Sequence, residues 1–229
     1  MKKISKKQKE IRKKIDFYKQ YNLEEASKLV KKTSFVRFNA SVDISVRLGL
    51  DTKKTNHMIR GGVFLPHGSG KRIDVLALVP TEKTKEAKES GADYVGLEEY
   101  LSKIREGWVD FDIIVTVPSV MPKLGILGRI LGPRGLMPNP KSGTVTLTPG
   151  NAVREIKSGK IDLQSDRYGI VHACIGKVSF TPKEIQENAC ALIHTLNRLK
   201  PPSTRGEYIK SIYLSNTMGP GISIDPKKI

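Results

Sequence analysis

The chain has 229 residues, 38% of them hydrophobic and 28% charged, and 40 Lys and Arg residues against 23 Asp and Glu leave a formal net charge of +17. This length suits two domains with proper hydrophobic cores, and the apolar fraction excludes a disordered chain. So strong a positive field attracts polyanions, because contacts with phosphates release their condensed counterions. The expected partner is therefore a nucleic acid.

Membrane and secreted classes are disfavoured by what the sequence lacks. No segment reaches the run of about eighteen apolar residues that crosses a membrane, and residues 1–14 lack the apolar run of a secretory signal. Two cysteines, Cys174 and Cys190, do not make a disulfide framework. We expect a protein of the reducing cytoplasm with no membrane association.

The first predicted elements are two helices and a strand. Residues 6–17 are predicted to form a basic helix. Asn22 is a suitable N-cap, with Glu25 three residues on in a capping-box arrangement, so a helix should run to Lys31. In residues 41–48, Val, Ile, Val and Leu alternate with polar residues, which indicates a half-buried strand.

The middle of the chain alternates strands with helices. We predict strands at 73–79, 93–95 and 113–117, with helices at 82–90 and 98–106. This spacing is typical of parallel βαβ units with helices on both faces of the sheet. Gly and Pro cluster at 66–70 and at 143–159, which we interpret as the points where the chain enters and leaves this block. Paired crossings of this kind can act as a hinge.

The last predicted elements are strands at 170–178, 209–213 and 222–224 and a helix at 182–199. The helix has one apolar stripe, formed by Ile185, Ala189, Leu192, Ile193, Leu196 and Leu199. Strands from both chain ends together with packed helices describe an α+β layer.

The distribution of charge indicates how these elements are grouped. The middle is near neutral, and residues 82–112 hold five basic against nine acidic residues, so the two ends carry the positive field. The simplest account is one basic α+β domain of residues 1–68 and 160–229, with an α/β domain of residues 69–159 inserted into it. Two independent consecutive domains are the alternative.

The densest motif, residues 124–143, reads LGILGRILGPRGLMPNPKSG. Its glycines would bring the backbone close to a partner, and Lys123, Arg129, Arg134 and Lys141 add positive charge with no acid between Pro118 and Gly150. Because glycine-rich basic loops suit phosphate oxygens, we predict a secondary RNA contact here. A tight loop whose glycines serve only its turns is the alternative.

Nucleotide and metal sites find little support. The segment 68–71 reads GSGK, but a phosphate loop needs glycine where Leu65 stands and Ser or Thr where Arg72 stands. Zinc ligands of the right type are present, at unfamiliar spacing, in His172, Cys174, Cys190 and His194. Free cysteines are commonly small buried hydrophobes, so we predict no metal and no cofactor.

Two segments near the chain ends fit RNA contacts. Residues 35–38 (FVRF) place cationic and aromatic groups beside the small polar residues of the predicted strand, a mixture that suits RNA. The alternative is that both phenylalanines are core and Arg37 is a solvated charge. The segment 215–221 (SNTMGPG) is predicted to be a small polar turn, where Gly219 and Gly221 would let the backbone approach a partner. A plain turn explains these glycines equally well.

Five motifs, in order along essentially the whole chain, resemble the ribosomal protein L1 family of bacterial type. They are RGGVFLPHGSGK (60–71), GADYVG (91–96), GWVDFD (107–112), LGRILGPRGLMPNPKSGTV (127–145) and SNTMGP (215–220). The resemblance implies an α+β sheet-plus-helices domain built from both termini and an inserted Rossmann-like three-layer α/β domain, joined by two hinge strands.

The resemblance also implies that the first domain carries the principal RNA site. Matched onto this sequence, the RNA-binding residues are Arg37, Phe38, Ser41, Asp43, Asp166, Arg167, Gly169, Ser211, Thr217, Met218 and Gly219. The chain departs from the family at Asn39 and Ala40, where acids are usual, and at Ser41 and Tyr168, where threonine is common.

The implied function is that of a structural constituent of the large ribosomal subunit, monomeric outside the ribosome and without catalytic activity. Such a protein binds the stalk of the large-subunit ribosomal RNA beside the tRNA exit site and assists release of deacylated tRNA. It also represses translation of its own operon by binding the messenger RNA. The alternatives are an RNA-processing enzyme, for which no coherent nucleophile or acid–base pair stands out, and a DNA-binding repressor, for which no helix-turn-helix pattern appears.

Overall fold

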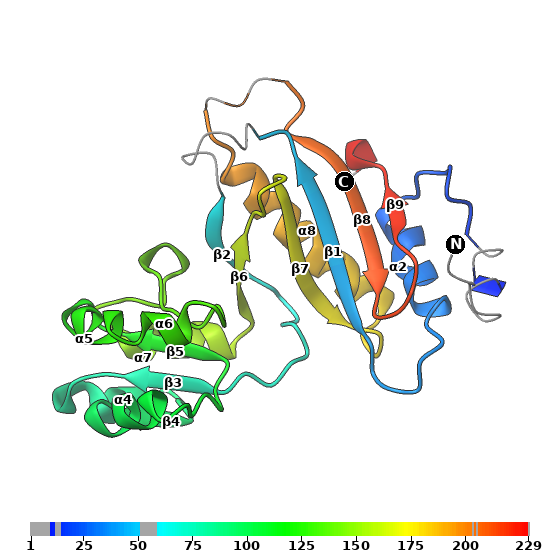
Figure 1. The fold of residues 1–229 in the computed structure, drawn as a ribbon. Helices are drawn as coiled ribbons and strands as arrows, with labels where there is room; N and C mark the ends of the chain where they lie inside the picture. Colours follow the sequence, from blue (N-terminus) through cyan, green and yellow to red (C-terminus); the bar gives the residue numbers. More distant parts are fainter. Residues whose placement is uncertain (1–9, 12–14, 51–58, 203, 205, 229) are drawn as a thin grey trace. The chain divides into compact units, whose positions relative to one another are not determined.

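The structure is a computed structural model that describes residues 10–11, 15–50, 59–202, 204 and 206–228 (Figure 1). The chain forms two compact units, one of residues 1–70 with 163–229 and one of residues 71–162. It therefore passes between the units twice, and each unit is described by itself.

The first unit contains a four-stranded antiparallel sheet in the order β7-β1-β8-β9. The strands are β1 (Ser41–Leu48), β7 (Ile170–Lys177), β8 (Ile209–Asn216) and β9 (Ile222–Ile224). All four strands were predicted. β8 extends three residues beyond the predicted end at residue 213, so Ser215 and Asn216 belong to the strand rather than to the turn that follows it.

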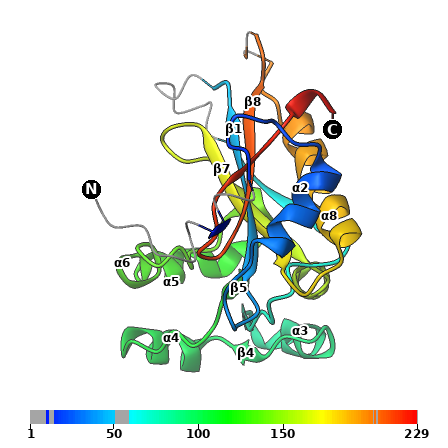
Figure 2. The same ribbon diagram turned by 90° about the vertical axis from the view of Figure 1, so that its right-hand side faces the viewer.

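Two helices, α2 (Leu23–Lys32) and α8 (Pro182–Arg198), cover one face of this sheet (Figure 2). The alternate side chains of β1 that face them are buried, as the period of two predicts. The N-terminus of α8 has a complete capping box between Thr181 and Glu184. The capping box predicted for α2 is wrong, because Asn22 accepts a hydrogen bond from the backbone N–H of Leu23 and not from Glu25.

Two strands, one beside each point where the chain passes between the units, were not predicted. β2 (Arg60–Phe64) and β6 (Lys160–Gln164) pair with each other in a separate two-stranded sheet. β2 contains Gly61 and Gly62 and shows no alternation of polar and apolar residues. β6 does alternate, with Ile161 and Leu163 between polar residues, so this strand could have been predicted from the sequence. Of the basic helix predicted at residues 6–17, residues 6–9 and 12–14 lie outside the described part of the chain, residues 10–11 are helical and residues 15–17 are not.

The second unit is a three-layer α/β fold around a parallel sheet in the order β4-β3-β5. Its strands are β3 (Val75–Leu78), β4 (Tyr94–Gly96) and β5 (Ile113–Thr116). Leu76 and Leu78 pack with helices α4 (Glu98–Arg105), α5 (Met121–Gly125) and α6 (Gly128–Leu131). Val75 and Ala77 point to the opposite face, which α3 (Thr84–Glu89) and α7 (Pro149–Lys157) cover. The predicted fold class, an α+β domain with an inserted Rossmann-like α/β domain, is confirmed.

The glycine-rich stretch is more ordered than the loop we predicted. It holds part of α5, all of α6 and the short 3₁₀ turn Pro140–Ser142. Buried Leu124, Leu127 and Leu131 recur at helical spacing, and the intervening glycines hid this period. Likewise, the Gly- and Pro-containing stretch 143–159 is mostly helix α7, which begins with Pro149 and buries Val153 and Ile156.

The remaining short elements are the 3₁₀ turns Thr81–Lys83, Pro118–Val120 and Pro226–Lys228. None of the helices in the described ranges is long and apolar enough to cross a membrane.

Candidate nucleic-acid interface

The face of the four-stranded sheet that points away from α2 and α8 is lined mainly by polar side chains, many of them small, with the phenol ring of Tyr213 among them. We call it the open face. Its residues are Ser41, Asp43, Ser45 and Arg47 of β1, Ile170, His172, Cys174 and Lys177 of β7, Ser211, Tyr213 and Ser215 of β8, and Ser223 of β9. Tyr213 is 46% exposed. An open sheet face with an aromatic ring is a surface on which an unpaired base can stack.

The turn after β8 is tied directly to the beginning of β1. The backbone N–H of Thr217 donates to the carbonyl of Ser41 (3.0 Å), and the N–H of Ser41 donates to the hydroxyl of Thr217 (3.0 Å). Lys177 Nζ donates to the Ser41 hydroxyl (2.8 Å). The structure thus brings together two of the predicted segments, which lie 176 residues apart in the sequence.

Around this connection the chain exposes two apolar side chains and a cation. Met218 is 64% exposed and Phe38 is 58% exposed, and Arg37, which precedes Phe38 in the sequence, is exposed too. Met218 has a φ of 68°, the left-handed value that a side chain other than glycine rarely adopts, and among the described residues no other non-glycine residue has a positive φ. Such local strain tends to occur at functional sites, where the surroundings hold it in place.

The loop at the other end of β1 is shaped by Asp166. Its carboxylate accepts the backbone N–H groups of Tyr168 (2.9 Å) and Ile170 (2.7 Å). Gly169 has a φ of 74° and its carbonyl accepts the N–H of Leu48 (2.8 Å). Asp166 and Gly169 therefore form the loop, whereas Arg167 is the member of this predicted group that the loop exposes.

Between these two ends, Asp43 and Ser211 were predicted RNA-binding residues, whereas Ser45, His172 and Tyr213 were not. Ser41 and Arg47 are six residues apart on one strand, about 20 Å at the usual rise per residue. Between them Ser45 pairs with Tyr213 across the sheet, and its hydroxyl lies 2.9 Å from Nδ1 of His172. The signal for Tyr213 was present, because it stands between the buried Ile212 and Leu214 in a predicted strand. The predicted site residues Asp43 and Ser211 therefore lie on the open face, between the turn Thr217–Gly219 at one end of β1 and the loop of Asp166 at the other.

The predicted secondary contact lies in the second unit. Arg129, Arg134 and Lys141 are exposed there. Lys123 is also exposed but its ammonium lies 2.5 Å from a carboxylate oxygen of Glu98, which neutralises part of its charge. Three of the four predicted cations are therefore better placed than the fourth to meet a phosphate.

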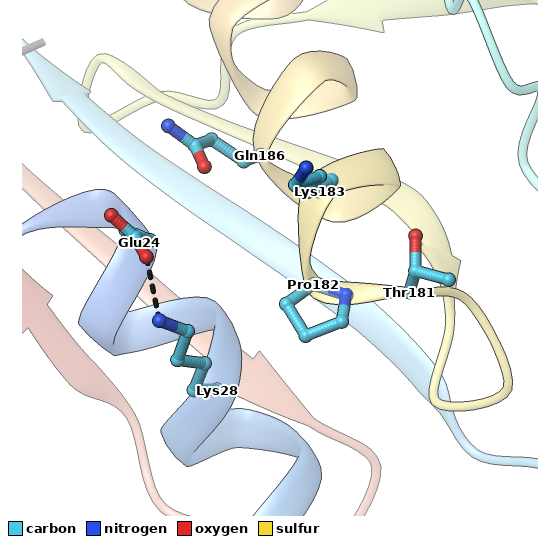
Figure 3. Close-up of a pocket in the computed structure, with 6 residues that line it drawn as sticks. All are labelled: Glu24, Lys28, Thr181, Pro182, Lys183 and Gln186. Atoms are coloured by element: carbon cyan, nitrogen blue, oxygen red, sulfur yellow. Dashed lines mark hydrogen bonds and ion pairs between the residues drawn. The ribbon is translucent and has the colours of Figure 1, made fainter.

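A pocket of about 530 Å³ lies between α2 and the beginning of α8, on the helical side of the first unit (Figure 3). It is lined by Glu24, Lys28, Thr181, Pro182, Lys183 and Gln186. The hydrogen bond from Lys28 (2.5 Å) lowers the pKa of Glu24, so the two side chains form an exposed ion pair. Because the helices separate it from the open face, this pocket is not part of the candidate interface.

The four candidate zinc ligands lie on different layers, His172 and Cys174 on β7 and Cys190 and His194 on α8. Within the described parts of the chain, no group of three or more His, Cys, Asp or Glu side chains is arranged to hold a metal ion.

Comparison with known proteins identifies the family. Residues 30–220 match the model of the family described as ribosomal protein L1p/L10e. The chain is 58% identical to the large ribosomal subunit protein uL1 of Parabacteroides distasonis and of Bacteroides thetaiotaomicron, over all of this chain and 99% of each relative. It is also 58% identical to the protein of that name from Flavobacterium psychrophilum, over the full length of both. The chain belongs to the ribosomal protein L1 family and is a structural constituent of the large ribosomal subunit, not an enzyme.

Proposed function

We propose that the first unit binds the stalk of the large-subunit ribosomal RNA through the open face and its two ends. Residues 1–68 and 160–229 form this RNA-binding domain in the proposal. As a ribosomal constituent the protein acts in the cytoplasm. The observation that carries the proposal is the turn Thr217–Gly219, in which the exposed Met218 has a left-handed backbone conformation and Thr217 is bonded to the start of β1.

Each part of the surface has a chemical role in this proposal. Met218 and Phe38 contact bases or riboses, because their exposed apolar groups gain most from leaving water. Arg37 and Arg167 neutralise phosphates, and the small side chains of the open face let the backbone of a folded RNA approach. The preformed turn reduces the conformational entropy lost on binding.

We propose a second RNA contact at Arg129, Arg134 and Lys141 of the inserted domain, residues 69–159, with a smaller share from Lys123. In the assembled subunit the protein would stand beside exit-site tRNA and assist release of deacylated tRNA. The same surface would bind a stalk-like element of its own messenger RNA and repress translation. Outside the ribosome the protein is proposed to be a monomer.

A filter-binding titration against an RNA fragment containing the stalk tests the principal contact. Met218→Asp places a carboxylate in the contact and is expected to weaken binding by about 100-fold, from lost apolar burial and repulsion of phosphates. Leu147→Asp is the matched control, since Leu147 is a similarly exposed apolar residue (69%) in the other unit. Equal affinity of Met218→Asp and the parent protein would remove this turn from the interface.

A further inference from the structure

The side chain of Asn216 is buried beneath the turn Thr217–Gly219, and the family resemblance did not place this residue in the RNA site. Asn216 is the last residue of β8 and is 4% exposed. Its backbone carbonyl accepts the N–H of Gly219 (2.9 Å), which closes the turn. With φ of 68° at Met218, the third residue of this turn, the geometry is one that normally requires glycine there.

The side chain of Asn216 connects the turn to helix α2. Its Nδ2 donates to the carbonyl of Val30 (2.7 Å), in the last turn of the helix, and lies 3.5 Å from the hydroxyl of Thr33. The Thr33 hydroxyl also donates to the Val30 carbonyl (3.0 Å). Carbonyls at the end of a helix lack partners within the helix, so these bonds satisfy one of them.

The other end of the Asn216 amide lies against the turn. Its Oδ1 is buried, and among the described residues it has no hydrogen-bond partner. A Cβ atom built at Gly219 would lie 1.6 Å from this oxygen. Asn216 therefore occupies the space that any side chain at position 219 would need, and the amide cannot swing away without losing its bond to Val30.

We propose that Asn216 is a positioning residue for RNA recognition, which holds Met218 in its left-handed conformation from below and couples the turn to the end of α2. Gly219 is required because the amide fills the space for its Cβ. The inference rests on the proposed RNA contact of Met218. It adds that the contact depends on a buried residue that does not itself touch RNA.

A double-mutant cycle on RNA affinity tests the coupling. Met218→Ala is expected to weaken binding of the stalk RNA fragment by about 10-fold in the parent protein, the loss from one buried apolar side chain. In an Asn216→Ala background the turn no longer holds Met218 in place, so the same substitution should cost less than about 3-fold. Asn216→Ala alone should weaken binding by a comparable factor of about 5–10.

A spectroscopic signal separates positioning from general destabilisation. The ε-methyl ¹³C resonance of Met218 is expected to lie apart from random-coil values in the parent protein and to move to them in Asn216→Ala. Asn188→Ala is the matched control, since Asn188 is a fully buried asparagine of the same unit that bonds to His67, Gly68 and Ile175, away from the turn. It should lower stability but leave both the methyl shift and the RNA affinity unchanged.

The proposal is overturned if folded Asn216→Ala binds RNA as the parent does, or if Met218→Ala costs the same in both backgrounds. Asn216→Ser, which keeps a small polar group, is evaluated by the same criteria if Asn216→Ala does not fold. Failure of the proposed function has a different signature: Met218→Ala would then leave binding unchanged in the parent protein itself.

Discussion

Replacing Thr217 with valine tests whether the turn is held by its bonds to β1. The two side chains have nearly the same volume, so the change removes only the hydroxyl. That hydroxyl accepts the N–H of Ser41 (3.0 Å) and lies 3.3 Å from the Ser41 carbonyl. The carbonyl keeps its bond to the Thr217 N–H, but the partly buried Ser41 N–H loses its acceptor. Leaving such a group unsatisfied costs about 1–2 kcal/mol of unfolding free energy.

Differential scanning calorimetry of the full chain measures this loss, provided that the two units melt separately. For a domain of this size, the melting temperature of the first unit should fall by roughly 3–6 °C. Affinity for stalk RNA should fall a few-fold, because the freed turn must be ordered on binding. Thr146→Val is the matched control, and it is expected to raise the melting temperature of the second unit rather than lower it. The Thr146 hydroxyl is buried and has no hydrogen-bond partner among the described residues, so its removal loses no bond. If Thr217→Val melts at the same temperature as the parent, or if Thr146→Val lowers the melting temperature of its unit by as much, the Thr217 hydroxyl does not hold the turn.

Three further predictions concern charge and stacking. Arg37→Gln should reduce the slope of log affinity against log salt by about one, the contribution of one phosphate contact, and an unchanged slope would exclude that contact. Tyr213→Ala should weaken the free energy of RNA binding by about 1–3 kcal/mol without changing the slope of log affinity against log salt. Unaltered affinity would show that the Tyr213 ring does not contact RNA. In the second unit, burial acts to raise the pKa of Asp93, but the bonds from Lys157 (2.5 Å) and the Val75 N–H (2.9 Å) outweigh it and hold the pKa below its usual value. A carboxyl whose pKa is lowered in the folded protein stabilises the fold at pH values above its unfolded-state pKa, and this stabilisation is lost as the group is protonated. The difference in melting temperature between the parent and Asp93→Asn should therefore shrink as pH falls from about 6 to below 4. A difference that stays constant over this pH range would contradict the assigned role of Asp93.

The elements of the first unit were predictable where one face is buried. In β1 and α8 the buried face imposes a period of two or of 3.6 on the sequence, and both elements were predicted to within one residue. The predicted end of β8 at residue 213 left out Leu214, which continues the apolar alternation. Ser215 and Asn216 were not predictable in this way, because Asn216 is polar yet buried and the alternation ends at Leu214.

The glycine-rich half of the second unit was less predictable. Helices α5 and α6 are only five and four residues long, and the glycine and proline within and around them are typical of loops, which hid the helical spacing of the buried leucines. The stability of these helices comes from packing of Leu124 and Leu131 in the core, a tertiary effect that local sequence does not encode.

Within the candidate interface, residue types were easier to predict than roles. Arg37, Phe38 and Met218 are exposed, as an RNA contact requires. Asp166 and Gly169, in contrast, shape the loop that exposes Arg167. This structural role follows only from the hydrogen bonds of Asp166 and Gly169 and not from the sequence. Asn216 acts from a buried position, and no motif in the sequence distinguishes it from a turn residue.

Co-sedimentation with large ribosomal subunits that lack this protein tests whether the turn Thr217–Gly219 is needed for binding to the ribosome. Parent protein and Met218→Asp are each added to such subunits and centrifuged across a range of salt concentrations, with Leu147→Asp as the control. We expect the parent and the control to sediment with the subunits and to leave them only at high salt, whereas Met218→Asp stays in the supernatant at moderate salt. Equal sedimentation of all three proteins at every salt concentration would contradict this expectation.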